Sequence, residues 1–311
     1  MDVLDWLLDS DPALRWQVLR DLTDASAEEV GAERARVSDS GWGARLLGLQ
    51  GSDGQWDGGT YFPSPFDNSE PGQPWTATTY SLLLLREFGL DPGSEAARTA
   101  VGRVSECSRW EEGGQPFFDG EVEPCINGMA VALGAYFGAN VDGIVSRLLA
   151  EQLDDGGWNC EAERGSTRSS FDTTINVLEG LLEYGRSGGR SPDVAAARQR
   201  GEEYLLERGL LRRKSTGDLI NPAWLLFSYP VRWHYDVLRG LDYFRAAGAA
   251  PDGRTAEALA LVESKRQPDG TWQLENSHPG RIHFPLDEGD GRPSRWNTLR
   301  AQRVLDWAAR A

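Results

Sequence analysis

The chain has 311 residues, of which 40% are hydrophobic, and it carries a formal net charge of −16. This length and apolar content allow one large domain or two small ones with a sizeable core. The negative charge argues against a nucleic-acid partner and against anchoring on an anionic membrane surface.

The sequence favours a cytoplasmic location. The stretch 1–16 is acidic and lacks the basic region and cleavage site of a signal peptide. The longest apolar run near the centre of a predicted helix is SLLLL at 81–85, far too short for a membrane span. Cys107, Cys125 and Cys160 form an odd set at irregular spacing, which is typical of a reducing compartment rather than of a disulfide framework.

Two kinds of helical segment alternate along the chain. Six segments are apolar on nearly every side and are predicted to be inner helices: 15–22, 75–90, 125–139, 171–185, 233–248 and 296–310. Four others carry charges on one face and are predicted to lie outside: 94–107, 142–153, 192–208 and 253–267. Alternating patterns typical of strands are scarce, so the predicted class is all-α.

Internal repeats predict how these helices are arranged. The heptapeptides WQVLRDL (16–22), INVLEGL (175–181) and YDVLRGL (235–241) align without a gap. A second phrase recurs as QGSDGQW, QLDDGGW and QPDGTW, ending at residues 56, 158 and 272, with a degenerate copy at 111–118. Such repeats build an open solenoid or a closed ring. Because the first and last repeats both look like ring members, we predict one domain, 1–311, folded as an (α/α)6 toroid of about six helical hairpins.

The tryptophans of this second phrase are predicted to be structural. Each phrase lies between an outer helix and the next inner helix, where Asp and Gly favour a turn and Gly can adopt a positive φ. Trp56, Trp158 and Trp272 would then bury a large area against their hairpins. We therefore expect none of the three to contact a substrate.

The Gln-x2–5-Gly-x-Trp pattern resembles the repeat signature of squalene–hopene and oxidosqualene cyclases, in the terpene cyclase and protein prenyltransferase superfamily. The resemblance covers nearly the whole chain and implies an α/α toroid that acts as an enzyme. Class II terpene cyclases protonate an alkene with the middle Asp of Asp-x-Asp-Asp-Thr. The matching segment, 169–174, keeps Asp172 and Thr173, but it has Phe171 at the position of the protonating Asp and Ser169 at the first Asp.

Resemblance to protein prenyltransferases implies a zinc site at the starts of the inner helices. Their Asp-x-Cys pair corresponds to Glu123 and Cys125, and Asp172 stands where their zinc-binding His would be. His234, which opens the following inner helix, could complete the set, with zinc as the candidate ion. The acidic stretch just before Cys125 would repel a diphosphate, which argues against transfer from a diphosphate donor.

Further candidates lie near the starts of the inner helices. Asp172 or Asp236 could act as a general acid oriented by His234. Structural alternatives remain open: Asp172 and Thr173 as helix caps, Cys125 as a small buried apolar residue, His234 as a core histidine. His278 and His283 lie in a loop that is either a lid or solvated. The candidate substrate contacts are Tyr61, Trp75, Thr76, Asn127, Phe171, Thr173, Tyr235 and Asn297.

These residues support two hypotheses of different classes. The first is an enzyme that acts on a small hydrophobic, isoprenoid-like molecule in the central cavity by acid or metal-assisted chemistry. Aromatic side chains at the mouth of the ring would suit a carbocation, although plain packing explains them equally well. The alternative is a non-catalytic ligand-binding toroid, since both family catalytic sets are incomplete.

Overall fold

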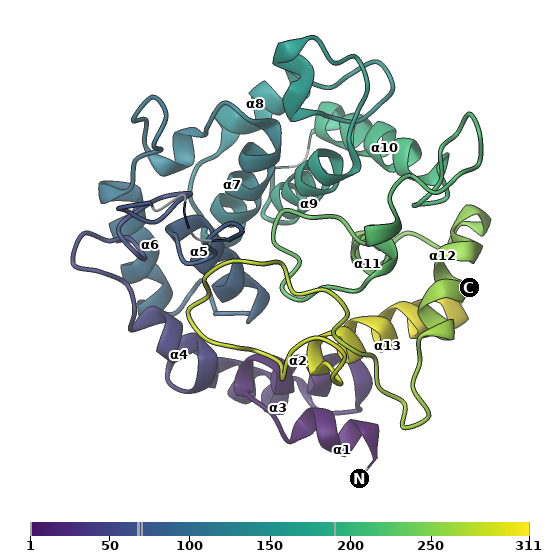
Figure 1. Ribbon diagram of the computed structural model, residues 1–311. Coiled ribbons are helices and arrows are strands. Elements are labelled where there is room, and N and C mark those ends of the chain that lie inside the picture. Colours follow the sequence, from purple (N-terminus) through teal and green to yellow (C-terminus); the bar gives the residue numbers. More distant parts are fainter. Residues whose placement is uncertain (1, 67–68, 70, 190, 311) are drawn as a thin grey trace.

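The computed structural model describes residues 2–66, 69, 71–189 and 191–310, and over these ranges the chain is helical with only isolated β-bridges (Figure 1). The inner helices are α2 (Pro12–Leu22), α5 (Thr78–Glu87), α7 (Pro124–Phe137), α9 (Phe171–Arg186), α11 (Val237–Ala247) and α13 (Arg295–Ala309). Around them lie α3 (Ala27–Ala35), α4 (Gly41–Leu47), α6 (Glu95–Cys107), α8 (Asp142–Ala150), α10 (Pro192–Leu206) and α12 (Ala256–Ser264), and α1 (Val3–Leu8) precedes the ring. The 3-10 helices are η1 (Arg36–Ser38), η2 (Phe117–Asp119), η3 (Cys160–Arg164), η4 (Pro222–Leu225) and η5 (Gly253–Thr255).

All six predicted inner segments are helices, and the predicted all-α toroid is confirmed. Two of them start later than expected: α5 begins at Thr78 rather than at 75, and α11 at Val237 rather than at 233. The cause at α11 is Asp236, whose side chain accepts a hydrogen bond from the Arg239 backbone N–H at 2.7 Å and caps the helix. A cap of this kind needs extended backbone, so the helix cannot continue through it.

Contacts between the first and last helices close the ring. Arg303 of α13 forms an ion pair with Asp21 and donates to the Gln17 side chain of α2 at 2.9 Å. The Arg295 guanidinium donates to the backbone carbonyl of Trp6 at 3.1 Å. An open superhelix would keep these ends apart, so the structure is the closed form of the two predicted arrangements (Figure 1).

The three repeated tryptophans join each outer helix to the inner helix that follows. All three are fully buried. Each indole N–H donates at 2.7 Å to a carbonyl ten residues earlier, and these carbonyls belong to Leu46, Leu148 and Val262. Each backbone N–H donates to a threonine of the next inner helix, Thr78, Thr174 or Thr298.

The turn before Trp158 requires glycine at position 156. Gly156 has a φ of +99°, and a Cβ there would lie 2.6 Å from the Arg200 carbonyl.

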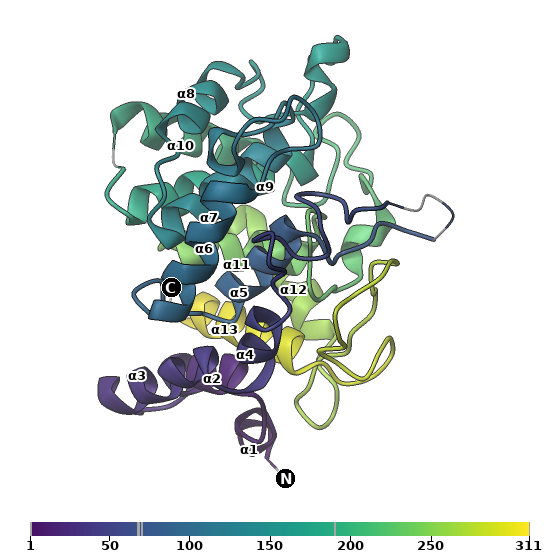
Figure 2. The ribbon, with the colours of Figure 1, turned by 90° about the vertical axis from the view of Figure 1, so that its left-hand side faces the viewer.

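Long loops gather on one side of the ring, where the inner helices begin (Figure 2). The Trp75 backbone N–H donates to the Arg281 carbonyl at 2.7 Å, which joins the loop before α5 to the loop before α13. The ring of His278 stacks on that of His234 with centroids 3.9 Å apart, and His283 hydrogen-bonds Ser81 at 2.9 Å. The loop of residues 275–289, called the histidine loop below, therefore packs across this end of the ring.

No helix in the described ranges is long and apolar enough to cross a membrane.

Candidate functional site

A cavity of about 440 Å³ lies in the centre of the ring and is lined by all six inner helices. The lining residues of α5, α7, α9 and α11 come mainly from the carboxyl-terminal halves of those helices, such as Arg86 and Arg245. The cavity therefore lies toward the end opposite the loops. Tyr229 and Val231, from the segment before α11, also line it.

The lining is strongly charged. It contains eight arginines, Arg20, Arg34, Arg86, Arg186, Arg239, Arg245, Arg300 and Arg303, and four carboxylates, Glu87, Glu179, Glu183 and Asp242. Two further carboxylates, Asp21 and Asp236, pair with lining arginines. Arginines still outnumber carboxylates by two when these are counted, in a chain whose net charge is −16. A local excess of positive charge inside an acidic protein favours an anionic ligand.

Some of these arginines form ion pairs with carboxylates. Arg239 donates to both oxygens of Glu179, at 2.8 and 2.7 Å, and Arg86 donates to Glu183 at 2.9 Å. Although burial opposes ionisation of Glu179, the guanidinium groups of Arg239, Arg86 and Arg300 together outweigh it and lower the pKa of that carboxyl. These pairs are structural, because their charges already neutralise one another.

Arg300 is different. Its guanidinium is 3.9 Å from both Asp236 and Asp242, and its hydrogen bonds are to the Ser228 carbonyl at 3.1 Å and to the Asn297 side chain at 3.3 Å. The ion-pair distances exceed the 2.7–2.9 Å typical of charge-assisted hydrogen bonds. Arg300 therefore keeps much of its capacity to donate to a ligand.

Five buried polar atoms of the lining have no hydrogen bond of good geometry among the described residues, although the Tyr229 hydroxyl and the Glu87 carboxylate lie close enough to interact with each other. They are Arg86 Nε, Arg303 Nε, Trp296 Nε1, the Tyr229 hydroxyl and Glu87 Oε2. Buried polar atoms are normally satisfied, and leaving one unpaired costs about 1–3 kcal/mol. Three of these atoms are N–H donors, so the cavity is suited to a ligand rich in acceptors.

Glu87 differs from Glu179 and Asp242, whose pKa values are lowered, because the pKa of its own carboxyl is raised. Burial raises the pKa of its carboxyl, although the guanidinium groups of Arg232 and Arg86 oppose this. Burial, with Glu87 as a further cause, also raises the pKa of the Tyr229 hydroxyl well above its usual value. A carboxyl with a raised pKa next to a ligand site is a candidate general acid.

The structure places the predicted acids elsewhere. Asp236 is 2% exposed and accepts from the backbone N–H groups of Arg239 and Ser228, at 2.7 and 3.1 Å. Burial raises its pKa, and Arg300 counteracts this. Asp236 is thus a paired helix cap and does not line the cavity. Asp172 accepts from the Tyr235 backbone N–H at 2.7 Å, and burial raises its pKa as well.

His234 lies between aromatic rings rather than beside an acid. It stacks on Trp233 at 3.7 Å and on His278 at 3.9 Å, and burial lowers its pKa to about 4. The ring is therefore neutral near pH 7, and within the described ranges it makes no hydrogen bond to Asp172 or Asp236.

The predicted substrate contacts are packing and capping residues in this structure, and none lines the central cavity. Asn127 is fully buried and exchanges two hydrogen bonds with the Glu121 backbone at 2.7 Å. Phe171 packs on Trp224 and Tyr235, with ring centroids 4.6 and 5.0 Å apart. The others are held by neighbours: Tyr61 and Trp75 by the Tyr80 ring, Thr76 by Asp57, Thr173 by Ser170, the Tyr235 hydroxyl by the Leu210 carbonyl and Asn297 by the Gln273 carbonyl.

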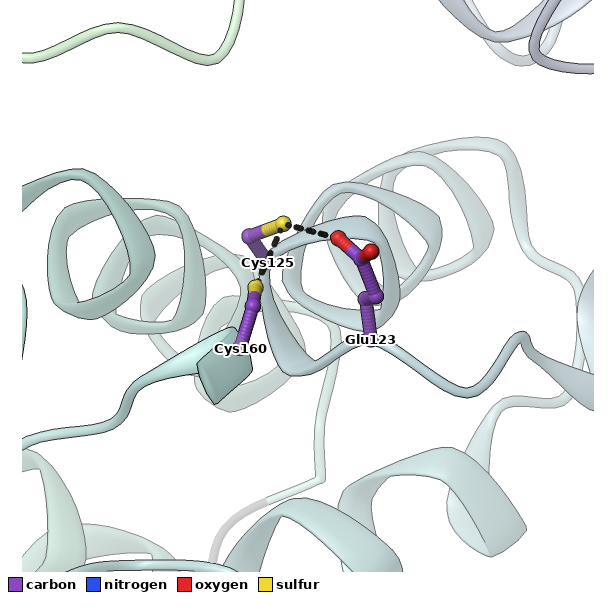
Figure 3. Close-up of side chains that lie close together, drawn as sticks. All are labelled: Glu123, Cys125 and Cys160. Atoms are coloured by element: carbon purple, nitrogen blue, oxygen red, sulfur yellow. Dashed lines mark hydrogen bonds between the residues drawn. The ribbon is translucent and has the colours of Figure 1, made fainter. Parts of the chain in front are cut away.

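Of the four predicted metal ligands, only Glu123 and Cys125 lie together, and the third member of their group is Cys160 (Figure 3). The Cys125 thiol donates to Glu123 at 3.5 Å, and the two sulfur atoms are 2.9 Å apart. Two thiolates on one tetrahedral zinc ion, with Zn–S bonds of about 2.3 Å, stand about 3.8 Å apart. The sulfur atoms are closer than this because the Cys160 thiol donates a hydrogen bond to Cys125, and a zinc ion would require them to move about 1 Å apart.

Comparisons with known proteins identify no family for this chain. No family model matches the chain, and no curated protein matches it. A solved structure of a protein from Actinoplanes is 16% identical, covering 96% of this chain and 90% of that one, with a TM-score of 0.43. A type II terpene cyclase, MstE, from Scytonema, solved in complex with its substrate geranylgeranyl dihydroxybenzoate, is 15% identical, covering 89% and 95%, with a TM-score of 0.37.

Sequence reasoning missed the cavity arginines and Glu87. The signal was present as charges inside otherwise apolar inner segments, such as Arg86 and Glu87 after the run of leucines at 82–85. A buried charge in such a helix is costly unless it is paired or faces a polar site.

Proposed function

We propose that this toroid is an enzyme that binds a small anionic molecule in the central cavity and transfers a proton to or from it. The observation that carries the proposal is the arginine-rich lining with unpartnered N–H donors. This proposal retains the general acid chemistry in the central cavity that the sequence suggested. It replaces Asp172 or Asp236 with Glu87 as the acid.

We assign separate roles to the lining residues of α13 and α5. Arg300 and Arg303 of α13 would hold the anionic group, because both are nearly buried and both keep unused donor capacity. Glu87 of α5, which lies next to the Tyr229 hydroxyl, would give or take the proton through Oε2. A positioned acid of this kind contributes roughly 10²–10⁴-fold to a rate.

The charged lining also restricts which hydrophobic substrates can bind in the cavity. Trp16 and Leu182 offer apolar surface, so an isoprenoid-like portion can be accommodated. A wholly neutral hydrophobic molecule would remove water from the arginines without replacing its hydrogen bonds, which is unfavourable. The substrate class that fits is therefore a small molecule with a phosphate or carboxylate group and an apolar part.

Binding can be tested by titration calorimetry with three separate probes: inorganic pyrophosphate, geranyl diphosphate and geraniol. Geraniol is the uncharged counterpart of geranyl diphosphate. We expect both anions to bind and geraniol not to bind. Replacement Arg300→Gln should weaken anion binding about 10–100-fold, the usual loss for a charged hydrogen bond. The control Arg98→Gln, on the exposed face of α6, should change affinity less than about twofold. Equal affinity of wild type and Arg300→Gln would contradict the proposal.

Catalysis needs a second measurement. Anions that bind can be incubated with the protein and followed by mass spectrometry or by exchange of a substrate proton for deuterium. Glu87→Gln should keep affinity within about threefold and reduce conversion at least about 100-fold. Binding without conversion of any tested anion would instead support the non-catalytic alternative.

A further inference from the structure

A pair of cysteines lies away from the cavity, at the loop-covered end of the ring. Cys125 is in the first turn of α7, and Cys160 is the first residue of η3, in the segment between Trp158 and α9. Their Sγ atoms are 2.9 Å apart, although 35 residues separate them in the chain (Figure 3). This is closer than two sulfur atoms on one zinc ion, and they approach without a bond between them.

The two thiols differ in their surroundings. Cys125 is 9% exposed and donates to Glu123, whereas Cys160 is half-buried and contacts the Thr173 hydroxyl at 3.4 Å. An external reagent can therefore reach Cys160 more easily than Cys125. The third cysteine, Cys107, is exposed at the end of α6 and serves as an internal comparison.

We propose that Cys125 and Cys160 are a thiol oxidation site that forms an intramolecular disulfide by exchange with small-molecule disulfides. The Cys160 thiolate attacks one sulfur of the reagent RSSR, which forms a mixed disulfide and expels RS⁻. Cys125 gives its proton to Glu123 and attacks the Cys160 sulfur, which expels the second RS⁻. Glu123 passes that proton to the second RS⁻, and the first RS⁻ takes up from solvent the proton that Cys160 had released. Two protein thiols are thereby oxidised to one disulfide while RSSR is reduced to two RSH.

The product would join the η3 segment to the first turn of α7. Both elements lie beside the start of α9, where Thr173 follows the Ser170 cap. The disulfide would therefore fix the connection after Trp158, and we expect it to reduce opening of residues 159–170 without altering the central cavity, which neither cysteine lines.

The test uses the full-length reduced protein with Cys107→Ser, treated with oxidised glutathione and followed by intact mass. We expect the mass of two hydrogen atoms to be lost, no stable adduct, and a peptide that joins Cys125 to Cys160. Adding Cys125→Ser should trap one glutathione on Cys160. Adding Cys160→Ser instead leaves Cys125 as the reacting thiol. We expect it to react with glutathione disulfide at least about tenfold more slowly than Cys160 does in the Cys125→Ser variant, because burial limits access.

A further variant separates chemistry from folding. Thr173→Val removes the hydroxyl contact to Cys160 and leaves both thiols in place, so it should still form the disulfide. Two separate glutathione adducts on the Cys107→Ser protein would overturn the proposal. The proposal would also be overturned if each chain held one tightly bound zinc ion that blocked oxidation and was released on replacement of either cysteine.

Discussion

At the scale of single residues, the molecule buries charge in an unusual place. Arg239 has only 5% of its side chain exposed, although it carries a charge in the first turn of the inner helix α11. Its guanidinium is satisfied by Glu179, by the Asn176 side chain at 2.9 Å and by the His234 carbonyl at 2.7 Å. The cavity arginines thus have two uses, since some fix neighbouring helices and others remain available.

Replacement of Arg239 should show the structural use. Arg239→Met leaves Glu179 without its partner, and breaking a buried pair in this way costs about 3–5 kcal/mol. Because the Glu179 side chain is 27% exposed, we expect the lower end of that range. The free energy of unfolding from urea titration measures it, with Arg98→Met as the matched control. A loss below about 1 kcal/mol would mean that the pair adds little.

Trp158 offers the second prediction at this scale. Its side chain is fully buried and its indole N–H is bonded to Leu148. Trp158→Ala should therefore lower the free energy of unfolding by roughly 3–5 kcal/mol, as for other buried tryptophans. Pyrophosphate affinity of the folded fraction should not change, because the side chain does not line the cavity. A large loss of affinity at an unchanged melting temperature would show instead that the side chain acts on the ligand site.

At the scale of elements, the histidine loop should respond to pH. Burial is the main cause that lowers the pKa of His234 to about 4 and of His278 to about 3. Both values lie below that of a free histidine, so protonation favours the state in which the rings are exposed. The stabilising effect is complete above pH 6.5, the usual histidine pKa, and is lost as the pH falls toward 4.

Hydrogen exchange of residues 275–289 measures this effect. After correction for intrinsic rates, exchange should be at least about tenfold faster near pH 4.5 than near pH 7.5, which corresponds to about 1.4 kcal/mol or more. His278→Phe keeps a stacking ring and removes one titrating group, so its response should be smaller. Equal protection of the wild-type loop at both pH values would contradict a stack that depends on neutral histidines.

The elements were also the level at which sequence reasoning worked best. Apolar periodicity located all six inner helices, because a helix that is buried all round leaves a continuous signal. Helix ends were less certain, since the cap at Asp236 depends on a backbone turn that periodicity does not record. The site was placed at the helix starts because the resembled families use that end. Loops without periodicity cover that end, and the charged cavity formed only when arginines far apart in sequence, such as Arg86 and Arg300, were brought together.

At the scale of the whole molecule, ring closure links stability at the two chain ends. The single domain predicted for 1–311 requires that no part unfolds alone. Arg303 connects α13 to α2 through Asp21 and Gln17, and burial lowers the pKa of Arg303 to about 10, so it remains charged at neutral pH. The closing contact is therefore an ion pair that persists under ordinary conditions.

Segment-resolved hydrogen exchange in increasing urea tests whether closure makes the molecule cooperative. In the wild type, the helices of residues 12–47 and those of 171–206 should have the same opening free energy, because each inner helix is held between its two neighbours in the closed ring. Arg303→Met leaves Asp21 without this partner, although Asp21 still contacts Arg20 at 2.6 Å. We expect about 2–4 kcal/mol less stability in both segments, and more in 12–47 if the ring opens there first. If residues 12–47 of the wild type exchanged at a lower urea concentration than residues 171–206, the chain would contain two cooperative units. Ring closure would then be only a contact between them.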